Sequence, residues 1–84
     1  MKYYYITFRS VTFAQKGERI LKGAGVECAI QRTPRQLSQR GCGYCLRVRP
    51  ADAMGAVQLL QNASVGYSRV YAVRGDGSIE DVKL

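Results

Sequence analysis

The sequence predicts a single α/β domain in which two helices cover one face of an antiparallel sheet. Three observations lead to this prediction. A chain of 84 residues has room for one modest core. A composition of 46% hydrophobic and 23% charged residues is ordinary for a globular protein. Four segments of alternating apolar residues and two segments of helical spacing follow one another in the order strand, helix, strand, strand, helix, strand.

The first half of the chain predicts a strand, a helix and a second strand. Residues 3–9 alternate, with Tyr4, Ile6 and Phe8 on one side. A helix over 12–24 follows, for which Ser10 or Thr12 offers an N-cap. Its expected apolar stripe is Phe13, Gly17, Ile20, Leu21 and Ala24. Residues 26–31 form the second strand, with Val26, Cys28 and Ile30 facing the helices.

The second half of the chain predicts a loop, a strand, a second helix and a fourth strand. Pro34 ends the second strand because proline lacks an amide proton, and residues 36–43 form a polar loop. A strand over 44–49 leads to a helix that begins at Pro50. The expected buried stripe of this helix is Ala53, Ala56, Val57 and Leu60. Residues 67–73 form the fourth strand.

This βαββαβ order predicts a ferredoxin-like sandwich over residues 1–74, because two right-handed crossovers place both helices on one face of the sheet. Residues 75–84 are a turn and a short C-terminal extension, either a further strand or a free end. The other face of the sheet is left uncovered. The alternation predicts that this open face carries aromatic and basic side chains: Tyr3, Tyr5, Cys45, Arg47, Arg49, Arg69 and Tyr71.

Composition excludes several classes of site. Histidine is absent, so one chain holds neither a Ser-His or Cys-His catalytic pair nor an imidazole metal ligand. Three cysteines cannot complete a four-ligand zinc site, although two chains could share a zinc or iron-sulfur site. We expect no cofactor and no metal. No apolar run approaches the roughly 18 residues of a membrane span, and no signal peptide is evident, so we expect a cytoplasmic protein.

The most informative residue is Cys42, which stands between two glycines in the predicted loop. Residues 28–51 contain no acid and five arginines, within a chain of formal net charge +7: Arg32, Arg35, Arg40, Arg47 and Arg49. A thiolate is favoured in such a field, and the thiolate is the nucleophile in persulfide or selenide transfer. Cys45 has the spacing of a resolving thiol for Cys42, or is simply a small strand residue. Cys28 is expected in the core.

The same segment supports a second interpretation. Arg40-Gly41-Cys42-Gly43-Tyr44-Cys45 resembles the beginning of the RNA-recognition-motif signature, in which basic, Gly, aromatic, Gly and aromatic residues follow one another. Cys42 replaces the first stacking aromatic residue, and alternation places Tyr44 on the helix side unless a bulge near Gly43 reverses it. An RNA- or protein-binding module that uses the open face is therefore the alternative function, and a dimer through that face is a third.

The chain also resembles a family of small bacterial selenium/sulfur carrier-like proteins over most of residues 3–72. The resemblance rests on three groups of residues: Tyr5-Ile6-Thr7-Phe8 with Ser10, Glu18-Arg19-Ile20-Leu21-Lys22 with Gly25, and Thr33-Pro34-Arg35 with Leu37-Ser38, Cys42-Gly43 and Leu46-Arg47. It implies that Cys42 is the carrier thiol and that Pro34, Arg35 and Ser38 shape its loop. Gln39-Arg40-Gly41 departs from the small residues usual before the cysteine, and Cys45 is an additional thiol.

The function predicted from the sequence is thus a thiol-based carrier of sulfur or selenium rather than a catalyst. Cys42 would accept the atom from a desulfurase-like donor protein and pass it to an acceptor, and Cys45 would discharge it as a disulfide. The predicted binding residues around the thiol are Arg35, Ser38, Arg40, Gly43 and Arg47. A homodimer is a possible assembly, nucleic acid is the less favoured partner, and no membrane is involved.

Overall fold

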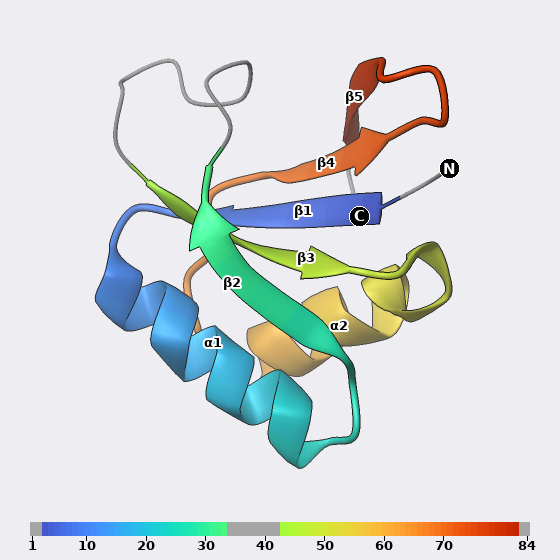
Figure 1. Ribbon diagram of the computed structural model, residues 1–84. Helices are drawn as coiled ribbons and strands as arrows, with labels where there is room; N and C mark the ends of the chain where they lie inside the picture. The colour runs from blue at the N-terminus through green and yellow to red at the C-terminus, as the bar shows by residue number, and fades with distance from the viewer. Residues whose placement is uncertain (1–2, 34–42, 83–84) are drawn as a thin grey trace.

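The computed structural model describes residues 3–33 and 43–82. Their elements are β1 (Tyr3–Phe8), α1 (Val11–Gly23), β2 (Cys28–Arg32), β3 (Tyr44–Val48), α2 (Pro50–Asn62), β4 (Val70–Val73) and β5 (Ile79–Val82). The five strands form one sheet of order β2-β3-β1-β4-β5, in which every neighbouring pair is antiparallel. Both helices lie on the same side of the sheet (Figure 1). The first four strands have the ferredoxin-like arrangement, so the predicted fold class is confirmed.

The sequence explains where the first helix begins and ends. Ser10 is the N-cap: its backbone is extended and its side-chain oxygen accepts a hydrogen bond from the Phe13 amide at 3.3 Å. At the other end Gly25 has φ +82°, a left-handed conformation that glycine adopts without steric cost. The buried residues of α1 are Ala14, Gly17 and Leu21. Phe13 is 47% exposed, so its predicted place in the buried stripe is wrong, and Ala14 takes that place. The predicted place of Ala24 is wrong too, because the helix ends at Gly23 and Ala24 is its exposed C-cap.

The core lies between the helices and one face of the sheet. Its largest fully buried side chains come from both layers: Phe8, Ile6, Leu21, Leu46, Leu60 and Val48. Gly17 allows α1 to approach closely, because a Cβ added there would lie 3.1–3.2 Å from side-chain atoms of Phe8, Leu46 and Leu60. Helix α2 buries Ala53, Ala56, Val57 and Leu60, the predicted stripe.

The starts of two strands differ from the prediction by two or more residues. β2 begins at Cys28 rather than at Val26, and β4 begins at Val70 rather than at Tyr67. β5 adds a fifth strand, which pairs with β4 from Val70↔Val82 to Val73↔Ile79. Two ion pairs, Arg69–Asp81 at 2.8 Å and Arg74–Glu80, join residues at the two ends of β4 to β5. The C-terminal segment is therefore part of the sheet as far as Val82.

Candidate functional site

The candidate site is the base of the connection between β2 and β3. Strand β2 ends at Arg32, and the amide of Thr33 donates a hydrogen bond to the carbonyl oxygen of Gly43 at 3.1 Å. This bond closes the base immediately before β3 begins at Tyr44. Cys42 is covalently joined to Gly43. The other predicted site residues of this connection, Arg35, Ser38 and Arg40, lie with Cys42 and Pro34 outside the described residues.

Gly43 occupies a position that disfavours a side chain. Its φ is +157°, and a Cβ built on it would lie 3.3 Å from the carbonyl oxygen of Phe8 and 3.3 Å from the hydroxyl oxygen of Thr33. Contacts this short require a neighbour to move, and the Phe8 carbonyl belongs to the central strand β1. Gly43 therefore brings the chain close against the end of β1 directly after the candidate thiol.

Cys45 is the nearest described cysteine to Cys42 in sequence, and it is fully buried, with 0% of its surface exposed. It lies opposite Thr7 of β1 and Gln31 of β2, on the sheet face away from the helices. Burial raises its pKa to about 11. The Thr33 hydroxyl, the Gln31 side chain and the positive charge of Arg47 oppose this rise without cancelling it. Cys45 is therefore a protonated, sheltered thiol at neutral pH.

The Thr33 hydroxyl beside it was not singled out by the sequence analysis. Its oxygen is buried and makes no hydrogen bond with any described residue. It nevertheless opposes the rise in the pKa of Cys45, because a hydroxyl can donate to a thiolate more strongly than to a thiol. In sequence, Thr33 stood out only as the residue before Pro34.

Cys28 is half-buried on the helix side of edge strand β2 and packs against the core. Its sulfur lies 4.0 Å from the carbonyl oxygen of Glu18 on α1. Burial raises its pKa, the negative charge of Glu18 raises it further, and Lys22 partly opposes them. The expectation that Cys28 belongs to the structure rather than to the chemistry agrees with this environment.

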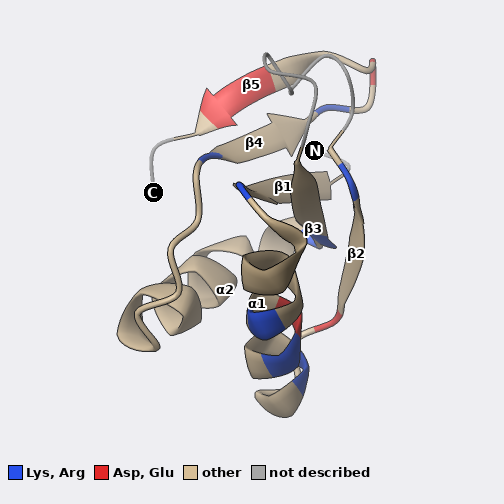
Figure 2. Cartoon of the chain, turned by 90° about the vertical axis from the view of Figure 1, so that its left-hand side faces the viewer, with Lys and Arg blue, Asp and Glu red and all other residues tan. Residues whose placement is uncertain are grey.

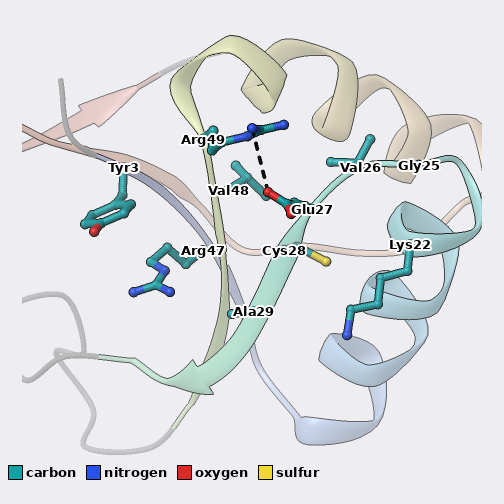
Figure 3. Close-up of a pocket in the computed structure, with 10 residues that line it drawn as sticks. All are labelled: Tyr3, Lys22, Gly25, Val26, Glu27, Cys28, Ala29, Arg47, Val48 and Arg49. Atoms are coloured by element: carbon teal, nitrogen blue, oxygen red, sulfur yellow. Dashed lines mark ion pairs between the residues drawn. The ribbon is translucent and has the colours of Figure 1, made fainter.

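Of the arginines in the acid-free stretch, Arg47 and Arg49 have partners among the described residues. The guanidinium of Arg47 lies over the Tyr3 ring, 4.8 Å from its centroid. Arg49 pairs with Asp52 at 3.1 Å and with Glu27 at 3.7 Å. An extended chain rises about 3.3 Å per residue, so Arg49 lies about 20 Å along the chain from Gly43. The expectation that Arg49 lies beside the candidate thiol is therefore wrong. Arg49 turns toward the helix side rather than standing on the open face (Figure 3).

An open pocket of about 570 Å³ lies at this far end of the β2–β3 hairpin, away from Gly43. Residues of its lining include Tyr3, Lys22, Glu27, Cys28, Arg47 and Arg49. Tyr3 and Arg47 lie on one side of β2, whereas Lys22 and the Cys28 sulfur lie on the other (Figure 3). The pocket therefore wraps around the sheet edge and does not gather these groups into one site.

The open face carries three half-buried tyrosines, Tyr3, Tyr5 and Tyr71. Tyr5 lies between Arg47 on β3 and Tyr71 on β4, with both neighbours directly opposite it. Arg69 precedes β4 and is held by Asp81. Tyr44 packs against the core on the helix side, so no bulge moves the aromatic residue of the RNA-recognition-like signature to the open face.

Within residues 3–33 and 43–82, no group of three or more Cys, Asp or Glu side chains is arranged to hold a metal ion. Neither helix in that part of the chain has the length and apolar character needed to cross a bilayer.

Neither the curated proteins nor the solved structures gave a match to the chain. A family model described as "putative Se/S carrier protein-like" matches residues 3–72, which include every described residue of the candidate site. The chain therefore belongs to the selenium/sulfur carrier-like family.

Proposed function

We propose that the protein carries sulfur or selenium as a persulfide or selenosulfide on Cys42. One observation carries the assignment: the other two cysteines, Cys28 and Cys45, both have raised pKa values caused first by burial. A carrier thiol must be ionised and must reach a partner protein, which a buried thiol of pKa about 11 cannot do. Membership of the family supports the same function.

The transfer step is a thiolate exchange. The Cys42 thiolate attacks the terminal sulfur of a donor persulfide, the donor S–S bond breaks, and a new S–S bond forms on Cys42. The electron pair of the broken bond leaves with the donor thiolate, so the step has no net oxidation. Attack of an acceptor nucleophile on the same terminal atom regenerates the Cys42 thiolate. A donor carrying terminal selenium would react in the same way.

Arg35 and Arg40 are proposed to stabilise the anion, as predicted from the sequence. Two described residues support a positive environment. Arg32 is exposed one residue before Thr33 and has no carboxylate partner in the described part of the chain. Arg47 lowers the pKa of Cys45 through its charge, two residues along the same face. Each charge favours a thiolate over a thiol.

Cys45 remains a candidate resolving thiol, but this role requires that its thiolate forms and reaches Cys42. Its thiolate would have to attack the Cys42 sulfur of the persulfide, release hydrosulfide and leave a disulfide that an external dithiol must reduce. Its burial and its pKa of about 11 make this thiolate scarce at neutral pH. We therefore propose that discharge proceeds directly from Cys42 to the acceptor.

The proposed partners are a desulfurase-like donor protein and a separate acceptor in a reducing cytoplasm. Three cysteines, an odd number, suit free thiols better than a disulfide framework in such a compartment. Donor and acceptor would meet Cys42 in turn, so one loop would serve both.

Mass spectrometry of the intact protein after incubation with glutathione persulfide tests the proposal. We expect a gain of the mass of one sulfur atom, located on Cys42 by peptide mapping and absent from Cys42→Ser. Cys28→Ser and Cys45→Ser are matched controls that should load as the wild type does. Loading that persists in Cys42→Ser and disappears in Cys45→Ser would contradict the assignment.

A further inference from the structure

We propose that the open sheet face binds single-stranded nucleic acid by stacking bases on its tyrosine rings. We call Tyr3, Tyr5, Tyr71 and Arg47 the tyrosine platform. This inference does not depend on the carrier thiol, because none of these residues belongs to the β2–β3 connection.

The platform is continuous across three neighbouring strands. Arg47 of β3, Tyr5 of β1 and Tyr71 of β4 lie directly opposite one another in register. Adjacent strands are about 4.8 Å apart, so the side chains on this row stand side by side. Tyr3 lies two residues before Tyr5 and therefore on the same face. All three rings are half-buried, and both helices lie on the other side of the sheet (Figure 1).

Such a surface suits the bases of a single strand. Every base has a π-face, so stacking on tyrosine is tolerant of sequence, and a duplex keeps its bases stacked on each other instead. The guanidinium of Arg47 already lies over the Tyr3 ring, and its remaining donors can bind a phosphate. The platform therefore offers aromatic rings for the bases and a guanidinium for a phosphate side by side.

The charge of the chain favours a polyanion as the partner, and Arg47 brings one positive charge to the platform itself. All six acidic residues lie in the described part of the chain. Five of them pair with Lys22, Arg49, Arg69 or Arg74, and Asp76 accepts a hydrogen bond from the Ser78 amide. The cations without a carboxylate partner among the described residues are Arg9, Lys16, Arg19, Arg32 and Arg47. Arg47 belongs to the platform, whereas Lys16 and Arg19 lie on α1, on the other side of the sheet. Figure 2 shows the acids of β5 at the opposite edge of the sheet from β2.

The same charge argues against a second copy as the occupant. A two-fold contact uses the same patch on both subunits, so pairing through this row would place two Arg47 side chains in one interface. The carboxylate at the far end of the row, Asp81, is already bound by Arg69 at 2.8 Å. A nucleic-acid strand supplies the negative charge that a second copy lacks.

Fluorescence anisotropy with a labelled single-stranded RNA of mixed sequence, at low and at physiological salt, tests the proposal. We expect binding that weakens as salt rises. Tyr5→Ala and Tyr71→Ala should each weaken it about 5- to 150-fold, the range for losing one base stack. Tyr5→Phe keeps the aromatic ring and loses only the hydroxyl, so it should bind RNA as the wild type does. This result would show that the ring itself is what binds. Circular dichroism establishes that each variant is folded.

A matched pair of charge variants separates the platform from general electrostatic attraction. Arg47→Gln and Arg19→Gln each remove one positive charge, but Arg19 lies on α1, on the other side of the sheet. We expect Arg47→Gln to weaken binding clearly more than Arg19→Gln. Equal effects of the two, equal binding of a duplex of the same sequence, or no binding at low salt would overturn the proposal. A dimer in sedimentation that Tyr71→Glu dissociates would show that the face binds a second copy instead.

Discussion

Raising the pH should unfold the protein partly through Cys45. Its pKa is about 11 in the folded protein against 9.0 for the unperturbed thiol, and the first cause is burial. The folded state therefore holds this proton more tightly than the unfolded state. The associated stability is fully present below about pH 9 and is lost as the pH rises from about 9 through 11.

The size of the effect follows from the two pKa values. A difference of about two pKa units corresponds to about 3 kcal/mol of unfolding free energy once both states are ionised, and to about 1.4 kcal/mol at pH 10. Cys45→Ala removes the titrating group and leaves every other ionisable group in place. Urea unfolding of both proteins at several pH values measures the difference directly.

The difference in unfolding free energy between wild type and Cys45→Ala should therefore shrink by about 1.4 kcal/mol between about pH 8 and pH 10. The cavity left by the alanine is the same at every pH, so it does not enter this change. A difference that stays constant over that range would mean that the buried thiol of Cys45 keeps its ordinary pKa.

Three further substitutions, each measured by urea unfolding, test two close backbone approaches and one helix cap. Gly17→Ala should destabilise the protein by about 1 kcal/mol, because overpacking at three core contacts exceeds the helix propensity gained; a more stable variant would contradict the observed close approach. Gly43→Ala should cost about 1–3 kcal/mol because its Cβ meets the Phe8 carbonyl, and an unchanged midpoint would show that the base of the connection tolerates a side chain. Ser10→Ala should cost about 1 kcal/mol through the lost N-cap while Ser10→Asp restores it, and equal losses in both would argue against capping.

Much of the fold was predictable because local patterns and tertiary packing agree in this chain. The stripe of α2 follows from four small or aliphatic residues at helical spacing, and the structure buries all four. Phe13 shows where such reasoning fails. Phe13 lies one helical turn before Gly17, so the spacing predicted that it would be buried. The structure buries Ala14 instead, and this small residue suits a helix that packs closely against the sheet. β5 stayed ambiguous because Ile79-Glu80-Asp81-Val82 becomes a strand only through pairing with β4.

The candidate site was predictable in its residue types and less so in its geometry. Sequence spacing grouped five arginines around Cys42, yet an extended strand carries Arg49 far from Gly43 and an ion pair with Asp52 holds it. Alternation placed Cys45 on the open face but could not show that it is fully buried, because burial depends on all the surrounding chain. The sequence did not point to the Thr33 hydroxyl for the same reason. Its burial without a hydrogen-bond partner among the described residues depends on the tertiary structure.

The rate of alkylation of each cysteine against pH, followed by peptide mass spectrometry, tests the central claim most directly. Cys42 should react first at neutral pH, with an apparent pKa below that of an unperturbed thiol. Cys45 should react last, in keeping with its pKa of about 11. A Cys42 that reacts no faster than Cys45, or only at the pH of an ordinary thiol, would contradict its assignment as the carrier thiol.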